Sequence, residues 1–162
     1  MPRPSRHEDR AAVATAVSVR AYCLSILENG RLEQKLQPPA PGLEDSGGEP
    51  LFIDAPAREG ELVPLPGAGS LPAIHELTAV EARVRCLQRF AHHELMAIEL
   101  FAWALLAWPD APRRLRRGWL AVLVDEQRHL RLYLCLLYTS PSPRDATSHR
   151  VCRRLLERGG GG

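Results

Sequence analysis

The sequence has little net charge, no paired cysteines and no long hydrophobic run. Its 162 residues carry a formal net charge of +2, which gives no electrostatic case for nucleic acid or an anionic membrane as a partner. The four cysteines are widely spaced and form no Cys-x-x-Cys pair, which favours a reducing cytoplasm over secretion. The charged N-terminus is followed by no apolar run long enough for a signal peptide. The most apolar stretch, Leu95 to Trp108, contains Glu99 and is too short to span a bilayer. We therefore expect a cytoplasmic protein.

Glycine and proline divide the chain, whose length suits one domain. Residues 1–37 form an N-terminal leader, in which a helix is predicted over residues 9–28 and Asn29-Gly30 ends it. Residues 38–72 are rich in proline and glycine and predict a long irregular connection. Residues 73–134 follow as a helix pair, and residues 135–162 form a tail.

The helix pair is the best-defined part of the chain. No glycine or proline occurs between Ala73 and Ala107, which permits a long helix. Pro109 should end it, because the residue before a proline disfavours the helical conformation. Asp110 is then a candidate N-cap for a second helix, with Pro112 just behind it. Apolar residues recur at helical spacing in both segments, so the fold class is all-α, with one long antiparallel hairpin.

Two acids and a histidine interrupt the apolar faces of this hairpin. Glu126 and His129 form a Glu-x-x-His motif, which places a carboxylate and an imidazole one turn apart on one helix face. Glu94 and Glu126 each lie sixteen residues from Asp110, so antiparallel helices bring both acids to the same height. Two facing buried carboxylates repel unless a cation neutralises them, and oxygen ligands with one imidazole suit iron or manganese. The sequence therefore predicts a metal site formed by Glu94, Glu126 and His129.

Simpler interpretations remain open at this point. Glu126 has polar neighbours and is also compatible with a solvated position, in which case the chain is a metal-free helical scaffold. Glu99 either supports a metal ligand or is a structural acid paired elsewhere. His93 is a weaker candidate for supporting a ligand, because it faces a different side of the helix from Glu94. The arginines of the segment 113–117 would suit a phosphate or an acidic partner, although a solvated turn is the favoured explanation.

Residues 74–134 resemble a bacterial ferritin-like family that is catalogued as a domain of unknown function. The resemblance lies in four segments: Arg89–Glu94, Ala97–Ala102, Pro109-Asp110 and Asp125–Tyr133. The pattern of Glu94 followed by Glu126-x-x-His129 is also similar to the first helix pair of rubrerythrin-like proteins and of the diiron hydroxylase that modifies tRNA. In that superfamily two helix pairs each supply Glu and Glu-x-x-His to one two-metal site.

The resemblance implies a non-haem diiron, or dimanganese, carboxylate protein. It makes Glu94, Glu126 and His129 metal ligands, with Glu126 bridging the two metals. It implies an oxidoreductase that uses dioxygen or peroxide, with an organic substrate that the sequence does not identify. Storage or sensing of iron is the alternative within the same superfamily.

Only one half of the ligand pattern is present in this chain. Residues 135–145 resemble translated library-adapter sequence, so we expect the natural protein to continue past Leu134. A functional proline–serine linker followed by a basic helix is the alternative for this tail. On the first interpretation the chain is an inactive half of the parent domain. Two chains could instead pair as a homodimer, because isologous contacts present the same face twice.

Overall fold

The computed structural model describes residues 18–62 and 70–139. Within these ranges the chain forms helices and no strand, which confirms the all-α prediction. The α-helices are α1 (Val19–Glu28), α2 (Leu32–Lys35), α3 (Val80–Ala107) and α4 (Arg113–Thr139), and the 3₁₀ turns are η2 (Gly60–Leu62) and η3 (Ile74–Thr78).

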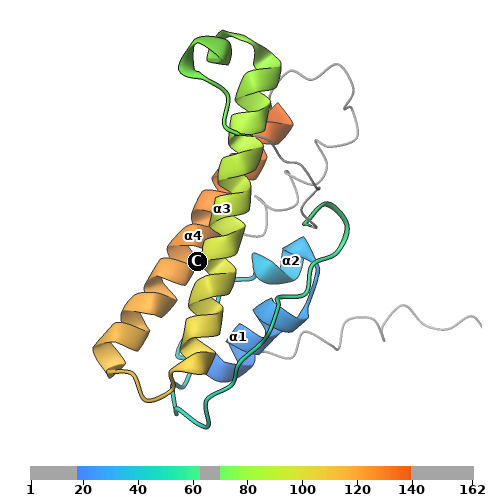
Figure 1. The fold of residues 1–162 in the computed structure, drawn as a ribbon. Coiled ribbons are helices and arrows are strands. Elements are labelled where there is room, and N and C mark those ends of the chain that lie inside the picture. The colour runs from blue at the N-terminus through green and yellow to red at the C-terminus, as the bar shows by residue number, and fades with distance from the viewer. Residues whose placement is uncertain (1–17, 63–69, 140–162) are drawn as a thin grey trace, which may run out of the picture.

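The long helices α3 and α4 form an antiparallel hairpin joined by a short turn (Figure 1). α3 ends at Ala107, as the proline at position 109 predicts. Its beginning differs from the prediction of a helix from about Ala73. There η3 comes first, and the extended backbone of Ala79 (φ −78°, ψ 139°) separates it from α3. The Arg83 side chain donates to carbonyls at the end of η3, which stabilises this break.

The second helix starts later and ends later than the sequence indicates. The Pro112 carbonyl accepts the first helical hydrogen bonds, at 2.8 Å from the amide of Leu115 and 3.1 Å from that of Arg116. Asp110 therefore lies in the turn and does not occupy the N-cap position predicted for it. At the other end α4 continues to Thr139. The boundary predicted at Leu134 consequently falls inside a continuous helix.

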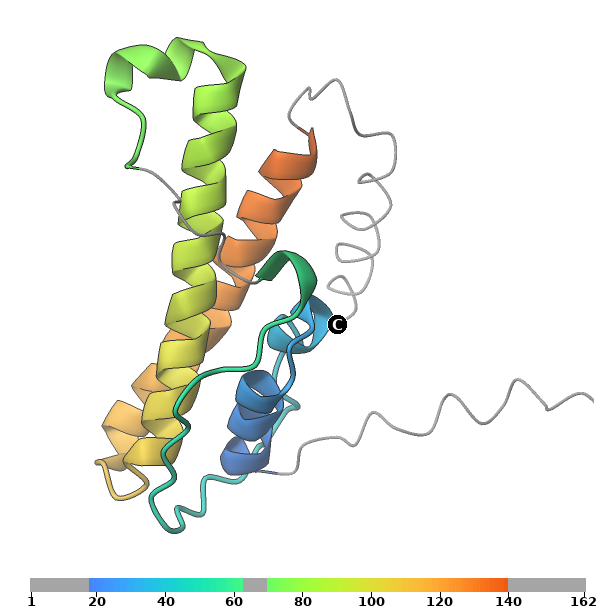
Figure 2. The same cartoon turned by 45° about the vertical axis from the view of Figure 1, so that its right-hand side comes forward.

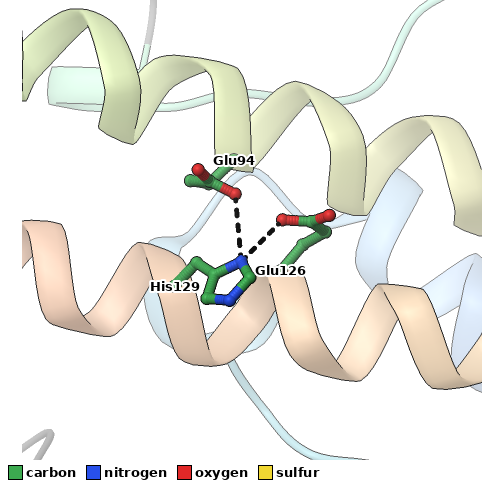
Figure 3. Close-up of side chains that lie close together, drawn as sticks. All are labelled: Glu94, Glu126 and His129. Atoms are coloured by element: carbon green, nitrogen blue, oxygen red, sulfur yellow. Dashed lines mark hydrogen bonds and ion pairs between the residues drawn. The ribbon is translucent and has the colours of Figure 1, made fainter.

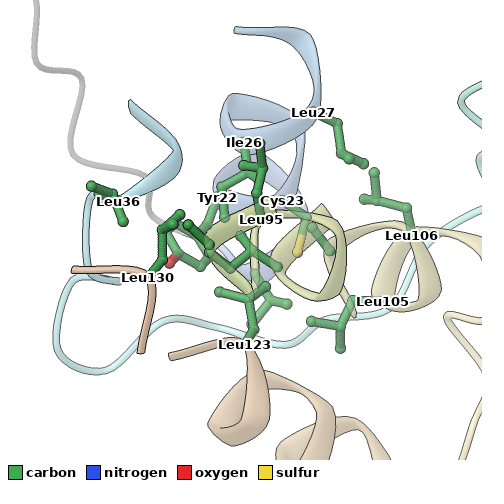
Figure 4. Close-up of a cluster of buried hydrophobic side chains, with 14 residues drawn as sticks. Tyr22, Cys23, Ile26, Leu27, Leu36, Leu95, Leu105, Leu106, Leu123 and Leu130 are labelled. Atoms are coloured by element: carbon green, nitrogen blue, oxygen red, sulfur yellow. The ribbon is translucent and has the colours of Figure 1, made fainter. Parts of the chain in front are cut away.

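The short helices α1 and α2 lie on one side of the hairpin (Figures 1 and 2). The predicted N-terminal helix is described from Val19, where the Ser18 hydroxyl accepts a hydrogen bond from the Ala21 amide; residues 9–17 lie outside the described residues. This helix ends before Asn29, as predicted. Figure 4 shows the apolar core between the short helices and the hairpin, which is formed by Val19, Tyr22, Cys23, Ile26, Leu27, Leu36, Ala91, Leu95, Ile98, Ala102, Leu105, Leu106, Leu123 and Leu130.

The irregular segment after α2 runs across α1 and the C-terminal half of α3. Its backbone is held by single hydrogen bonds, from the Leu51 amide to the Leu106 carbonyl (3.0 Å) and from the Ala57 amide to the Leu27 carbonyl (2.7 Å). At Gly30 it approaches so closely that an added Cβ would lie 2.5 Å from Glu59 Cγ and 3.0 Å from its backbone nitrogen. Only glycine leaves room for this contact.

The arginines that begin α4 have two different environments. Three are exposed, whereas the Arg116 guanidinium is buried and binds Asp45 (2.5 Å). The same guanidinium donates to the carbonyls of Leu105 and Trp108 at the end of α3, at 2.8 and 2.7 Å. Because the last carbonyls of a helix have no partner within it, Arg116 satisfies them and joins both helices to the connection.

By length and composition α3 is a candidate membrane span, although its most apolar stretch, Leu95 to Trp108, is by itself too short to cross a bilayer. Half of its most apolar window is buried inside the protein. Core helices of soluble proteins share these properties, so they do not place α3 in a membrane.

Candidate metal centre

Glu94, Glu126 and His129 come together between α3 and α4 (Figure 3). One ligand atom from each lies within 4.8 Å of the other two. The His129 Nδ1 atom lies 3.1 Å from Glu126 Oε2 and 3.6 Å from Glu94 Oε2. All three predicted metal ligands are therefore neighbours, and their donor atoms converge.

The convergence follows from the regularity of the two helices. Because the rise per residue is the same in both, residues equally distant from the turn meet across an antiparallel pair. Glu94 and Glu126 satisfy this condition, and His129 follows one turn later on the same face of α4. No irregular segment is needed to position any of these side chains.

The cluster lies between solvent and core. The side chains of Glu94 and Glu126 are 18% and 21% exposed, and that of His129 is 53% exposed. Burial, and then the neighbouring Glu126, raise the pKa of Glu94 to about 7. A hydrogen bond from Glu94 lowers the pKa of Glu126, and the Glu126 carboxylate raises the pKa of His129. In the metal-free protein, protons therefore do what a cation would do, since they reduce the repulsion between two carboxylates.

The second buried acid of α3 has a different environment. Glu99 accepts bonds from Lys35 Nζ (2.9 Å) and from the Arg58 guanidinium (2.5 Å) on its two oxygens. Of the two roles left open for Glu99, these ion pairs are those of a structural acid. His93 is exposed and lies about 100° around α3 from Glu94. Neither residue belongs to the cluster of possible ligands found among the described residues.

Sequence reasoning missed a buried polar network beside the cluster. The Gln127 side chain is fully buried, and its amide nitrogen donates to the carbonyls of Lys35 (2.7 Å) and Gln37 (3.0 Å). Its oxygen accepts a hydrogen bond from the Tyr22 hydroxyl (3.2 Å). Position alone could have indicated it, because Gln127 lies four residues after Leu123 and three before Leu130, on the side of α4 that faces the core. Nothing in the sequence identifies its partners.

A family described as "Protein of unknown function (DUF455)" matches residues 11–140. The chain belongs to this family. The DUF455 match includes all three cluster residues and both long helices, and it extends past Leu134 to the end of α4. No curated protein and no solved structure matches the chain. The family assignment thus agrees with the predicted resemblance to a domain of unknown function, and its chemistry has to be inferred from the site.

Proposed function

We propose that this DUF455 chain binds iron or manganese through Glu94, Glu126 and His129, as one half of a ferritin-like two-metal carboxylate centre. The observation that supports the proposal is the convergence of three donor atoms within 4.8 Å on an antiparallel helix pair. Antiparallel helices carrying Glu and Glu-x-x-His are the usual construction of such centres.

The donor set fits a divalent ion. Two carboxylates balance a charge of +2, and oxygen with one imidazole nitrogen suits iron and manganese better than softer metals. Donor atoms bound at about 2.1 Å from one ion lie at most about 4.2 Å apart, so the present spacing closes by less than about 1 Å. Small side-chain rotations of Glu94 and His129 would supply that movement.

The three residues divide the work of the site. Glu94 would hold the ion from α3, and Glu126 would bridge to a second ion. His129 would supply the nitrogen ligand, which its contact with Glu126 already orients toward the cluster. Bound iron would supply the redox chemistry, in which dioxygen or peroxide oxidises a substrate.

The thiols of Cys23 and Cys86 are free, in keeping with the reducing, cytoplasmic location proposed from the sequence.

Metal content tests this function directly. The protein is loaded anaerobically with Fe(II), freed of excess metal, and assayed for iron per chain beside the Glu126→Ala variant. We expect about one iron per chain in the native protein and none in the variant. Asp125→Asn is the matched control, because Asp125 is the neighbouring acid but is exposed and paired with Arg128 at 2.6 Å. Stoichiometric iron in Glu126→Ala would refute the proposal.

The redox part of the proposal has its own readout. Oxygen consumption by the Fe(II)-loaded protein should exceed that of free Fe(II) at the same concentration, and it should fall to that level in Glu126→Ala. Iron that binds without any increase in oxygen consumption would leave a metal site and remove the oxidoreductase.

A further inference from the structure

The cluster provides only three protein residues as ligands. Iron and manganese ions with oxygen and nitrogen ligands commonly take six. Among the described residues, the groups of acids, histidines and cysteines close enough to share an ion comprise Glu94, Glu126 and His129 and no fourth member. A complete site therefore needs donors from elsewhere.

The cluster lies on the face of the hairpin that α1 and α2 leave uncovered. The ribbon of these helices lies behind the hairpin in Figure 3, whereas the three ligands lie toward the viewer. The bonds made by Glu99 and Gln127 support this placement of the cluster. Both side chains bond to α2 or the connection after it, and both lie on other sides of their helices from Glu94 and Glu126.

Aromatic and aliphatic side chains flank the ligands on this face. On one side Phe90 is 40% exposed and its ring lies 5.8 Å from that of Tyr133. On the other side Leu115, which lies eleven residues before Glu126 and so on the same face of α4, is 46% exposed. Apolar surface grouped around an incomplete polar site is typical of a protein interface.

The size of this face decides how strongly a partner would bind. From Phe90 to the end of α3 it is about 26 Å long by helical rise, and two packed helices are about 18 Å wide. Each of two such faces would bury roughly 500 Å², or roughly 1,000 Å² in total, which is the lower limit for a specific interface. Apolar contact alone would therefore give a weak pair, and additional bonds are needed to hold it.

We propose that a second copy of this chain packs the same face against the first about a two-fold axis through the cluster. Each copy thereby supplies Glu94, Glu126 and His129 to a shared two-metal site. The inference rests on the proposed function. A second copy fits better than another partner because it brings the missing donors at the matching height, with apolar residues on both sides of them.

The proposal makes pairing and metal binding mutually dependent. Without metal the two faces would bring four carboxylates together, and their repulsion opposes an already small interface. Two divalent ions neutralise these charges and bind to both copies. By linkage, whatever favours the pair must tighten metal binding to the same degree.

The test measures mass and metal together, with Mn(II) as a redox-stable probe. The full chain is freed of metal and examined by light scattering during size-exclusion chromatography, with and without Mn(II). We expect a mass near that of the 18.0 kDa chain without metal and twice that mass with it. Equilibrium dialysis should give one Mn(II) per chain, with half-saturation at a lower metal concentration as the protein concentration rises.

Matched variants separate the interface from the ligands. Leu115→Glu places a charge on the proposed interface, away from the ligands, and should raise the Mn(II) concentration needed for pairing at least tenfold. Met96→Glu is the control, because Met96 is equally exposed (47%) but lies on the opposite side of α3 from Glu94, and it should pair like the native chain. Circular dichroism confirms that both variants keep their helices. Glu126→Ala should neither bind Mn(II) nor pair.

Each contrary outcome overturns a defined part of the argument. If Mn(II) binds one per chain while the mass stays near that of a single chain, the shared site is wrong and the proposed function stands. A pair that forms equally without metal, or in Glu126→Ala, also overturns the shared site. If no Mn(II) and no Fe(II) bind at any protein concentration, both proposals are wrong.

Discussion

Two glutamates on α3, five residues apart, are both withdrawn from solvent and have opposite electrostatic environments. Glu99 is enclosed by two cations, Lys35 and Arg58, which contact both of its oxygens. Glu94 faces a second acid, Glu126, and a half-exposed histidine. The first acid has the partners that a buried charge requires. Glu94 has less positive charge around it than a buried carboxylate requires, and a bound metal ion would supply that charge.

The same contrast occurs between neighbours on α4. Gln127 faces the core with every polar atom of its side chain bonded, whereas Glu126 faces the cluster. A neutral amide is found where the surroundings supply only carbonyls and a hydroxyl, and an acid where a cation could bind. The comparison predicts that substitutions on the core side reduce stability, and that those on the cluster side change metal binding instead.

The largest expected effect is on the paired acid. Glu99→Gln leaves the fully buried Lys35 ammonium without its counter-charge and should destabilise the protein by about 3–5 kcal/mol. Chemical denaturation measures this change. Glu81→Gln, at an exposed acid of the same helix, should change stability by less than about 0.5 kcal/mol. Equal small losses in both variants would show that Glu99 does not compensate the buried cations.

Metal should stabilise the folded protein through the two acids of the cluster. At Mn(II) one hundred times above its dissociation constant, the free energy of unfolding should rise by about 2.7 kcal/mol. The increase should vanish in Glu94→Gln and His129→Asn and persist in Asp125→Asn. Thermal unfolding with and without Mn(II) gives the comparison. A stabilisation that survives the loss of His129 would place the metal elsewhere.

A smaller loss is expected at the buried amide. Gln127→Leu removes the donor to the Lys35 carbonyl and should cost about 2 kcal/mol, because a buried acceptor loses its partner. Glu126→Gln, one residue earlier, keeps a hydrogen-bonding side chain at a partly exposed position and should cost the metal-free protein less stability than Gln127→Leu. Urea denaturation of both variants in the presence of a chelator decides between core and cluster roles. The reverse order would contradict the assignment of the two faces.

The smallest effect is a gain of stability. The pKa of Glu94 is about 7 in the folded, metal-free protein, above its ordinary value of 4.5, so the folded state keeps a proton that the unfolded state releases. Stability attributable to this group is therefore present below pH 4.5 and is lost as the pH rises through 7.

Glu94→Gln is neutral at every pH and avoids this loss. Because Glu94 is 18% exposed, solvent reduces the effect, and we expect a gain of about 1 kcal/mol at pH 8 and none at pH 4. Unfolding at both pH values in the presence of a chelator measures it. A destabilised variant at pH 8 would mean that Glu94 already has a cationic partner in the metal-free protein.

The sequence by itself determined the hairpin and the meeting of its three candidate ligands. A single turn connects the two helices, and a constant rise per residue converts equal sequence distances from that turn into equal heights. Pro109 marks the end of the first helix without reference to any distant residue. The predictions for the start of α3 and the N-cap of α4 were wrong. Hydrogen bonds of the Arg83 side chain and of the Pro112 carbonyl set these two helix ends.

Only the tertiary structure decided what Glu99 and Gln127 do. Their partners lie 41 to 105 residues away in the chain, in α1, in the short helix α2 and in the irregular connection that follows it. Helical spacing could show that these side chains leave the apolar pattern, but the neutralising charge and the accepting carbonyls come from segments whose path no local rule predicts. Local geometry therefore placed Glu94 and Glu126 together, and long-range packing supplied the cations around Glu99.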